Sequence, residues 1–296
     1  MNRGFTLIFT LLLYSCVFSQ ADLERMLDAE KAFLQAASEN GIRSAFLQVL
    51  ADDSIIFRPN AVKGKEFWKT REDSSALLLV RKSLYSDIAS NGMLGYTTGN
   101  WRIFPKGKSE SQAEFGQYVT IWEKRAGGKF FASLDIGITH EKLLFSETDR
   151  TWRMDKSRDP NKRGWSPADA SMNFLKMSMS QARLGAAYDK FAASDVRLLI
   201  EQQPPILGKK NVVSEMKRYV SIEFPKRVAL FQSADMAYTW NPCQFANSNE
   251  GIESGNCLHI WKLRKKKWWI VLGVFARVYS EAQPTLKIRP KNKSNG

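Results

Sequence analysis

The sequence is poor in the residues that most often build metal centres. It has two histidines, His140 and His259, and three cysteines, and no Cys-x-x-Cys pair occurs. Structural zinc sites use four Cys or His ligands at characteristic spacings, so the sequence argues against one. We therefore expect no metal ligands and no metal site in this chain.

Motifs for phosphate binding and nucleophilic catalysis are also missing. The chain contains no GxxxxGK[ST], GxGxxG or Gly-x-Ser-x-Gly pattern. These motifs place backbone amides around a phosphate or expose a nucleophilic serine on a sharp turn. The sequence therefore predicts no phosphate-binding loop and no serine nucleophile of this type, and we expect no cofactor.

The N-terminal segment has the pattern of an export signal. Arg3 supplies a positive charge, Phe5–Leu13 is an apolar run too short to span a bilayer, and Val17–Ser19 precedes Gln20. This order is typical of a secretory signal peptide. We expect residues 1–20 to be a signal peptide, cleaved near Ser19 or Ala21.

Lipid anchoring through Cys16 is an alternative to simple cleavage. The stretch Leu13-Tyr14-Ser15-Cys16 has Leu at −3 and Ser at −1 of the cysteine, although Tyr14 is bulky for a lipobox. Either route exports the protein, to the periplasm or outside the cell. Contact with a membrane is expected only through that lipid.

The chain is basic, with a formal net charge of +14 over 296 residues, 44% of which are hydrophobic. The length allows two domains, and the hydrophobic content predicts a packed protein. The densest basic runs are Lys262–Lys267 and Lys287–Lys293. Neither alternates with aromatic residues on one face as single-strand binding requires. We interpret the charge as a solvated surface and expect no nucleic-acid partner.

A hairpin pattern occurs twice. Gly116–His140 reads as two strands joined by a tight turn at Arg125–Gly128, and Asn256–Arg277 is a degraded copy about 139 residues later. Shared offsets of this kind indicate one fold written twice. The matched positions are Ile121-Trp122 with Ile260-Trp261, and Lys129-Phe130-Phe131 with Lys267-Trp268-Trp269.

The order of predicted elements gives the domain boundaries. Two helices over 22–40 and 42–50 precede a strand ending at Pro59 and a series of further strands. Charged residues make up half of the segment 146–165, which is typical of a linker. We expect a first domain at 21–145, the linker at 146–165, a second domain at 166–280 and a basic tail at 281–296.

This order resembles the nuclear-transport-factor-2-like, or SnoaL-like, superfamily, and within it the exported branch of unassigned function. The resemblance covers residues 24–140 well and 170–278 loosely. It rests on Ala29–Phe33, Leu50–Asp53, Phe57-Arg58-Pro59, Val62–Lys65, Leu94–Gly99 and Trp122–Ile138.

The resemblance implies an α+β fold. It implies two cone-shaped domains, each a curved antiparallel sheet wrapped around N-terminal helices and leaving a pocket. Some members of the superfamily isomerise, dehydrate or cyclise their substrates, whereas others only bind or dimerise. The fold alone therefore does not decide the function.

Pairing across the first hairpin predicts a candidate site. A loop centred on Ala126-Gly127 places opposite each other residues whose numbers sum to 253, with all six side chains on one face. Asp135 is a general-base candidate with Tyr118 as hydrogen-bond donor; the other interpretation is that Asp135 only specifies the core. The candidate pocket comprises the pairs Tyr118–Asp135, Thr120–Ser133 and Trp122–Phe131, together with Tyr96 and with His140 at the rim.

The second domain lacks the corresponding groups. Gly273 stands where the first domain has Asp135, and Cys257 stands where it has Tyr118. We therefore expect any site to belong to the first domain.

Cys243 and Cys257 are expected to form a disulfide. They flank the loop 244–256, and an oxidising compartment permits the bond. Closing a loop of about 15 residues stabilises a protein by about 3 kcal/mol in the chain-entropy model.

Three functional hypotheses remain open. The first is binding of a small hydrophobic molecule in an apolar pocket of the first domain. The second is an isomerase- or lyase-type enzyme that transfers a proton on a hydrophobic substrate. The third is an interaction module whose sheet faces pair with each other or with a second copy of the chain.

Overall fold

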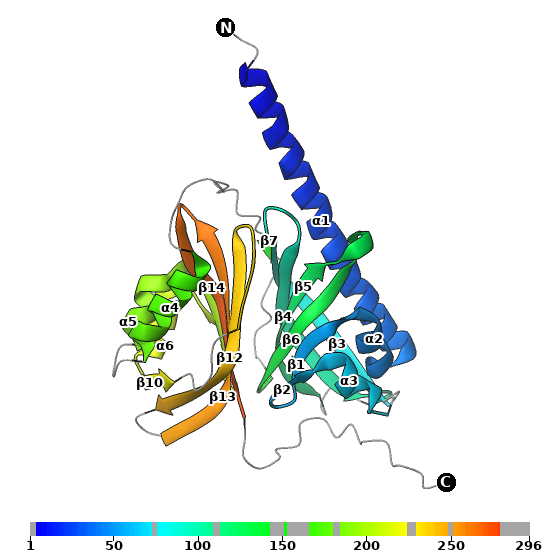
Figure 1. Ribbon diagram of the computed structural model, residues 1–296. Coiled ribbons are helices and arrows are strands. Elements are labelled where there is room, and N and C mark those ends of the chain that lie inside the picture. The colour runs from blue at the N-terminus through cyan, green and yellow to red at the C-terminus, as the bar shows by residue number, and fades with distance from the viewer. Residues whose placement is uncertain are drawn as a thin grey trace.

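Two curved sheets, each covered on one side by helices, make up the protein. The computed structural model describes residues 4–72, 76–108, 113–142, 151–152, 166–179, 184–223, 229–247 and 251–278. The helices lie on the two outer sides, and the sheets face each other in the middle (Figure 1). This arrangement confirms the predicted α+β class with two curved sheets and N-terminal helices.

The first unit, residues 4–152, contains one sheet with the strand order β2-β1-β6-β5-β4-β3-β7. All neighbours in it are antiparallel except β1–β6 and β3–β7, which are parallel. Its elements are α1 (Gly4–Asn40), α2 (Ile42–Val49), β1 (Leu50–Phe57), β2 (Ala61–Lys63), α3 (Gly64–Lys69), β3 (Leu77–Ile88), β4 (Leu94–Pro105), β5 (Glu114–Lys124), the 3-10 turn η2 (Ala126–Gly128), β6 (Phe130–His140) and β7 (Thr151–Trp152).

The second unit, residues 166–278, has the sheet order β10-β12-β13-β14-β8-β9, with β11 also paired to β12. As in the first unit, the strand that follows the second helix pairs in parallel with the last strand of the hairpin. Its elements are α4 (Pro167–Ser178), α5 (Leu184–Phe191), β8 (Ala192–Ile200), β9 (Ile206–Leu207), α6 (Lys209–Met216), β10 (Tyr219–Glu223), β11 (Ala229–Ser233), β12 (Met236–Asn247), β13 (Gly251–Arg264) and β14 (Lys267–Arg277).

Helix α1 is longer than the sequence pattern predicts, because it begins at Gly4 rather than near Asp22. Its C-terminal half packs against the first sheet through an apolar stripe that includes Met26 and Phe33. Gly41 follows the helix with φ +88°, a conformation that glycine adopts readily. None of the helices in the described ranges is long and apolar enough to cross a membrane.

The register of the first hairpin differs from the predicted one. Arg125 N donates to Lys129 O at 2.9 Å, which closes a five-residue loop and places Lys124 opposite Phe130. A β-bulge then adds Ser133 to β6, so that Thr120 rather than Tyr118 lies opposite Asp135. The predicted pairs Tyr118–Asp135, Thr120–Ser133 and Trp122–Phe131 are therefore wrong, because neither the loop length nor the bulge was anticipated.

The second hairpin carries a bulge at the matching place. In β5 the register shifts between Ile121 and Trp122, and in β13 it shifts between Ile260 and Trp261. Each tryptophan donates its indole N–H to a threonine on the neighbouring strand, Trp122 to Thr97 at 2.9 Å and Trp261 to Thr239 at 3.2 Å.

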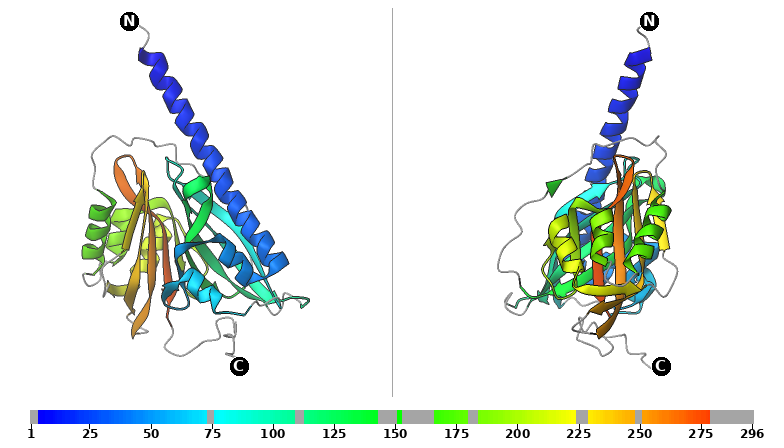
Figure 2. Two further views of the ribbon diagram at one scale, coloured as in Figure 1. Left: turned by 45° about the vertical axis from the view of Figure 1, so that its right-hand side comes forward. Right: turned by 90° about the vertical axis from the view of Figure 1, so that its left-hand side faces the viewer.

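The faces of the two sheets that carry no helices pack against each other. One buried apolar cluster includes Tyr96, Ile121 and Ile136 from the first unit and Leu258 and Val274 from the second. Views from two further directions show the same layers, with helices only on the outside (Figure 2). Burial of these apolar side chains stabilises the paired arrangement.

Cys243 and Cys257 are joined by a disulfide with a Cα–Cα distance of 6.0 Å. They lie diagonally on β12 and β13, because Cys243 pairs with Gly255 and Cys257 with Asn241. Of the predicted linker 146–165, only the short strand β7 is described, and the predicted basic tail 281–296 lies outside the described residues.

Candidate functional site

A cleft of about 120 Å³ lies between α1 and β3 in the first unit. Leu27, Glu30, Lys31 and Leu34 form its helical wall, at the i, i+3, i+4, i+7 spacing of one helix face. The strand wall is the continuous run Arg81–Ser86, where a register irregularity between Ser83 and Tyr85 disturbs the pairing with β4.

Aromatic side chains fill the space between the helices and the sheet of the first unit. Phe46 stacks on Trp68 with centroids 4.7 Å apart, and Phe33 meets Phe46 edge-on at 4.8 Å. Trp68 and Trp122 are each 1% exposed. The cleft therefore lies between α1 and β3 and not among these packed rings.

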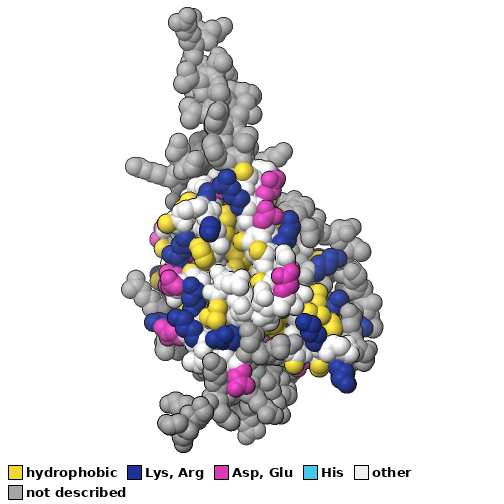
Figure 3. Space-filling model, turned by 90° about the vertical axis from the view of Figure 1, so that its right-hand side faces the viewer, with side chains coloured by type: hydrophobic (Ala, Val, Ile, Leu, Met, Phe, Trp, Pro, Cys, Tyr) yellow, Lys and Arg dark blue, Asp and Glu magenta, His cyan; other side chains and the backbone are white. Residues whose placement is uncertain are grey.

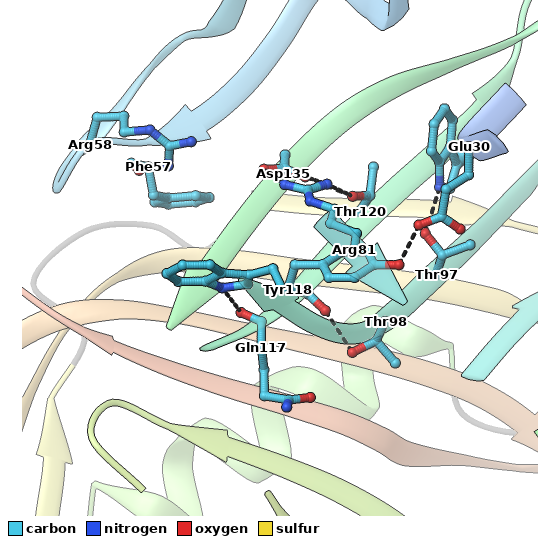
Figure 4. Close-up of polar contacts among 12 residues, drawn as sticks. Glu30, Phe57, Arg58, Arg81, Thr97, Thr98, Gln117, Tyr118, Thr120 and Asp135 are labelled. Carbon is cyan, nitrogen blue, oxygen red and sulfur yellow. Dashed lines mark hydrogen bonds and ion pairs between the residues drawn. The ribbon is translucent and has the colours of Figure 1, made fainter. Parts of the chain in front are cut away.

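A buried ion pair lies beneath the cleft. Arg81 donates to both carboxylate oxygens of Asp135, at 2.9 and 3.1 Å, and Thr120 Oγ1 donates to Asp135 Oδ2 at 2.7 Å. The Arg81 guanidinium lies over the Tyr118 ring, 4.4 Å from its centroid. Figure 4 shows these side chains converging from β3, β5 and β6.

Asp135 is held as a carboxylate. Burial by itself would raise its pKa, but the charge and hydrogen bonds of Arg81, with smaller effects from Arg58 and Thr120, lower the pKa below its ordinary value. Asp135 also raises the pKa of Arg81 against the opposing effect of burial. An ion-paired carboxylate of low pKa is a weak proton acceptor, so this geometry favours the other interpretation, in which Asp135 specifies the core.

Tyr118 has a different partner from the predicted one. Its hydroxyl donates a short hydrogen bond to Glu30 Oε1 on α1 (Figure 4). Burial raises the pKa of Glu30, and the Tyr118 hydrogen bond and the Arg81 charge oppose that rise only in part. Glu30 therefore places a carboxyl group of raised pKa on the cleft wall.

The predicted site residues divide between different places. Tyr118, Thr120, Trp122 and Asp135 point to the helix-covered side of the sheet, whereas Tyr96 lies in the cluster between the two sheets. Ser133 is the bulged residue, and its hydroxyl donates to Ile121 O. Alternation places Phe131 on the face of the sheet that Trp122 does not occupy. The ring of His140 contacts Gln117 and Glu141 at the strand end.

Two glycines make room for Trp101 above this site. A Cβ on Gly116 would lie 2.5 Å from the Trp101 ring and 2.0 Å from Ile138 O, and one on Gly137 would lie 3.5 Å from the Trp101 indole nitrogen. Trp101 Nε1 donates to the carbonyls of Gln117 and Ile138 at 3.1 and 3.2 Å. The indole thereby ties β4 to β5 and β6.

Sequence reasoning missed Glu30 and Arg81, although each carries a signal. Glu30 is an acidic residue within the apolar stripe of the helix, between Leu27 and Phe33. Arg81 falls at an inward position of an apolar strand. A charge at a core position of either element indicates a buried partner.

The second unit has no counterpart to this ion pair among its described residues. Gly273 lies opposite His259 on β13. The Tyr188 hydroxyl lies next to Gly273, where a side chain would otherwise project, and is 2.8 Å from His259 Nε2. Burial lowers the pKa of His259 to about 3. His259 is therefore neutral and serves as a hydrogen-bond partner within an aromatic core.

The helix-covered face of the first unit carries charges of both signs. Lys and Arg side chains are spread over the helix-covered face of the first unit rather than gathered on one element (Figure 3). Within the described ranges, no three His, Cys, Asp or Glu side chains come together as a metal-binding group.

No family model and no curated protein matches the chain. Solved structures match part of it. A putative ketosteroid isomerase from Parabacteroides distasonis is 12% identical with a TM-score of 0.33, over 39% of this chain and 90% of its own. A nuclear-transport-factor-2-like protein from Cytophaga hutchinsonii is 11% identical with a TM-score of 0.33, over 38% of this chain and all of its own.

A third match is a protein of unknown function with a cystatin-like fold from Nostoc punctiforme. It is 14% identical with a TM-score of 0.32, over 40% of this chain and 97% of its own. At TM-scores this low, the likenesses carry no argument about the site or the activity of this chain.

Proposed function

We propose that the protein binds a small molecule in the cleft between α1 and β3 of the first unit. The observation that carries this proposal is that the cleft wall includes Glu30, a buried carboxyl group fixed by Tyr118. Binding sites commonly combine apolar walls with a few convergent polar groups. The cleft has this composition, with leucines on both walls.

The size of the cleft limits the ligand. Drug-sized ligands occupy pockets of roughly 300–1,000 Å³, and this cleft has about 120 Å³. An engineered cavity of about 150 Å³ in another protein holds benzene. We therefore propose a ligand about the size of one six-membered ring, which is smaller than a steroid or a polyketide.

The charges around the cleft favour an acidic group on the ligand. Lys31 and Lys82 lie at its exposed edges, and Arg81 is on the wall. The Arg81 guanidinium is buried in its ion pair with Asp135 and adds positive charge at the base of the cleft. The single acidic residue, Glu30, has a raised pKa, which reduces its repulsion of an anion.

We assign this binding no catalytic step. Both carboxyl groups near the cleft already have strong partners, since Asp135 pairs with Arg81 and Glu30 accepts from Tyr118. The second unit, in which a tyrosine–histidine pair fills the corresponding place, has a structural role in this proposal. We infer that the two units are tandem copies, an inference supported by their matching element order and hairpin bulges.

Titration with sodium benzoate, followed by amide resonances in two-dimensional NMR spectra, tests the proposal. Benzoate has one ring and one carboxylate. We expect concentration-dependent shifts at Glu30 and along Arg81–Ser86 and not in the second unit. Shifts that are absent from both walls of the cleft, or that are confined to other surfaces, would contradict it.

A matched pair of variants gives the control. Leu34→Trp places an indole in the cleft, whereas Gln35→Trp places the same group on the exposed face of the same helix. We expect Leu34→Trp to abolish the benzoate shifts and Gln35→Trp to leave them unchanged. Equal responses in the two variants would place the site elsewhere.

We also propose that the protein is exported. The leader pattern in residues 1–20 and the Cys243–Cys257 disulfide support this, because disulfides persist mainly in oxidising compartments. Mass spectrometry of the mature N-terminus distinguishes the two routes. Cleavage near Ser19 or Ala21 indicates a signal peptide, a lipid on Cys16 indicates anchoring, and an intact Met1 on a cytoplasmic product overturns both.

A further inference from the structure

A fully buried lysine joins the two units. Lys262 on β13 is 1% exposed, and its Nζ donates to Ile88 O at 2.8 Å and to Asp87 Oδ1 at 3.3 Å, both on β3 of the other unit. Its third neighbour is Asp235 Oδ2 at 3.4 Å. The ammonium group thus hydrogen-bonds to two acceptors of the first unit and forms an ion pair with a carboxylate of its own unit.

Asp235 of the second unit accepts a hydrogen bond from the first unit. It belongs to the turn before β12 in the second unit, and its Oδ1 accepts from the backbone N–H of Ser90 in the first unit at 2.6 Å. Beside it, Asn91 and Ser233 hydrogen-bond across the units at 3.0 Å. The β3–β4 turn and the β11–β12 turn are thereby held together.

The charges in this cluster do not balance. Two carboxylates, Asp87 and Asp235, face one ammonium group away from water, and burying an unpaired charge is costly. Asp87 is 0% exposed, and within the described residues its Oδ2 has no hydrogen-bond partner. One added proton on Asp87 would leave Lys262 paired one-to-one with Asp235.

We propose that Asp87, Lys262 and Asp235 form a proton-linked clasp, which holds the two units together more tightly when mild acid adds one proton to the cluster. The proposal concerns the contact between the units and does not depend on ligand binding in the cleft. It gives the protein a conformational response to pH that is separate from the site in the first unit.

The electrostatics of the surroundings support this direction. Burial raises the pKa of Asp87 to about 6; Lys262 and the Ile88 N–H oppose the rise, and Asp235 adds to it. The other titratable groups facing Asp87 are Tyr85 and Tyr96, whose pKa values are raised by burial, so both are neutral. Beyond them, Arg264 and Asp195 neutralise each other in an ion pair at 2.6 Å.

The direction of the pH effect on docking of the two units follows from proton linkage. A carboxyl group whose pKa is higher in the docked state than in the open state binds its proton more tightly when docked. The stabilisation is complete below the ordinary pKa of 3.8 and is lost as pH rises through about 6. Between those values, the docking equilibrium changes by up to about tenfold per pH unit.

Carboxyl-detected NMR of the ¹³C-aspartate-labelled wild-type protein measures the titration directly, and Asp87→Asn identifies the resonance. We expect a midpoint near 6, shifted downward in Asp235→Asn because a neighbouring negative charge is removed. The carboxamide oxygen that this substitution introduces still accepts from the Ser90 N–H, which keeps the variant folded. A wild-type midpoint at or below 4, or no shift in Asp235→Asn, would overturn the clasp.

Hydrogen exchange at the Ser90 amide reports on opening of the contact. After correction for the intrinsic rate, we expect protection in the wild type to fall between pH 4 and 6 and to be flat in Asp87→Asn. Asp28→Asn is the control, because Asp28 is exposed on α1 and pairs only with nearby Lys31 among the described residues. The same pH profile in the wild type and Asp87→Asn would contradict the proposal.

Discussion

Arg81 on β3 donates hydrogen bonds to both carboxylate oxygens of Asp135 on β6, at 2.9 and 3.1 Å, across the helix-covered face of the first sheet. The two residues are 54 positions apart and lie on strands separated by β4 and β5. Their side chains are 8% and 3% exposed. The pair anchors the floor beneath the cleft.

Breaking this pair from one side will destabilise the protein strongly. Arg81→Met removes the main partner of the buried Asp135 carboxylate, and the expected loss in the free energy of unfolding is about 3–5 kcal/mol. The double change Arg81→Met/Asp135→Leu should recover most of this loss, because both charges are removed together. Urea unfolding of the wild type, the two single variants Arg81→Met and Asp135→Leu, and the double variant measures these free energies. An equal loss of stability in Arg81→Met and in the double variant would contradict the account.

The same pair predicts a loss of stability in acid. The pKa of Asp135 is lowered in the folded state, so its contribution is present above the ordinary value of 3.8 and disappears as pH falls through the folded-state pKa. Asp135→Asn should be less stable than the wild type at pH 6, with a difference that shrinks below pH 4. A difference that stays constant from pH 6 to pH 2 would contradict this.

Glu30 should show the opposite pH dependence. Its pKa is raised in the folded state, so its contribution is complete below the ordinary value of 4.5 and is lost as pH rises through the folded-state pKa. Glu30→Gln should therefore flatten the pH dependence of stability above pH 4.5. The exposed Glu39→Gln on the same helix is the control, and thermal unfolding from pH 4 to 8 measures both.

The strand faces of the first hairpin could be predicted from the sequence, but its register could not. Alternation along β5 correctly placed Tyr118, Thr120 and Trp122 on one face, because this periodicity is local. The pairing across the hairpin was wrong, because the loop has five residues and because Ser133 adds a bulge farther along β6. The five-residue loop, which pairs Trp122 with Ala132, explains why Phe131 does not share a face with Trp122.

Partners that are distant in sequence could not be predicted from patterns. Glu30 and Tyr118 are 88 positions apart, and Asp87 and Lys262 are 175 apart. Periodicity identifies the face on which a charged residue lies but not the group that it meets there. The α+β class and the helical and strand segments were accessible, because they depend on local order.

The glycines beneath Trp101 give a graded stability prediction. Gly116→Ala forces a Cβ to within 2.0 Å of Ile138 O, whereas Gly137→Ala approaches Gln117 O only to 3.3 Å. We expect Gly116→Ala to cost more than about 3 kcal/mol, as overpacking against backbone does in the severe cases. Gly137→Ala should cost about 1 kcal/mol or less. Equal melting temperatures would contradict the close packing of Trp101.

A crystal structure of the protein soaked with 4-bromobenzoate is the most direct test of the central claim, that the cleft between α1 and β3 binds a ring-sized anion. Bromine scatters anomalously, so its position is identified independently of the lighter atoms around it. We predict a peak between Leu34 and the Arg81–Ser86 strand wall, with the carboxylate near Lys31 or Lys82. A cleft without bromine, with peaks only on other surfaces, would contradict the claim.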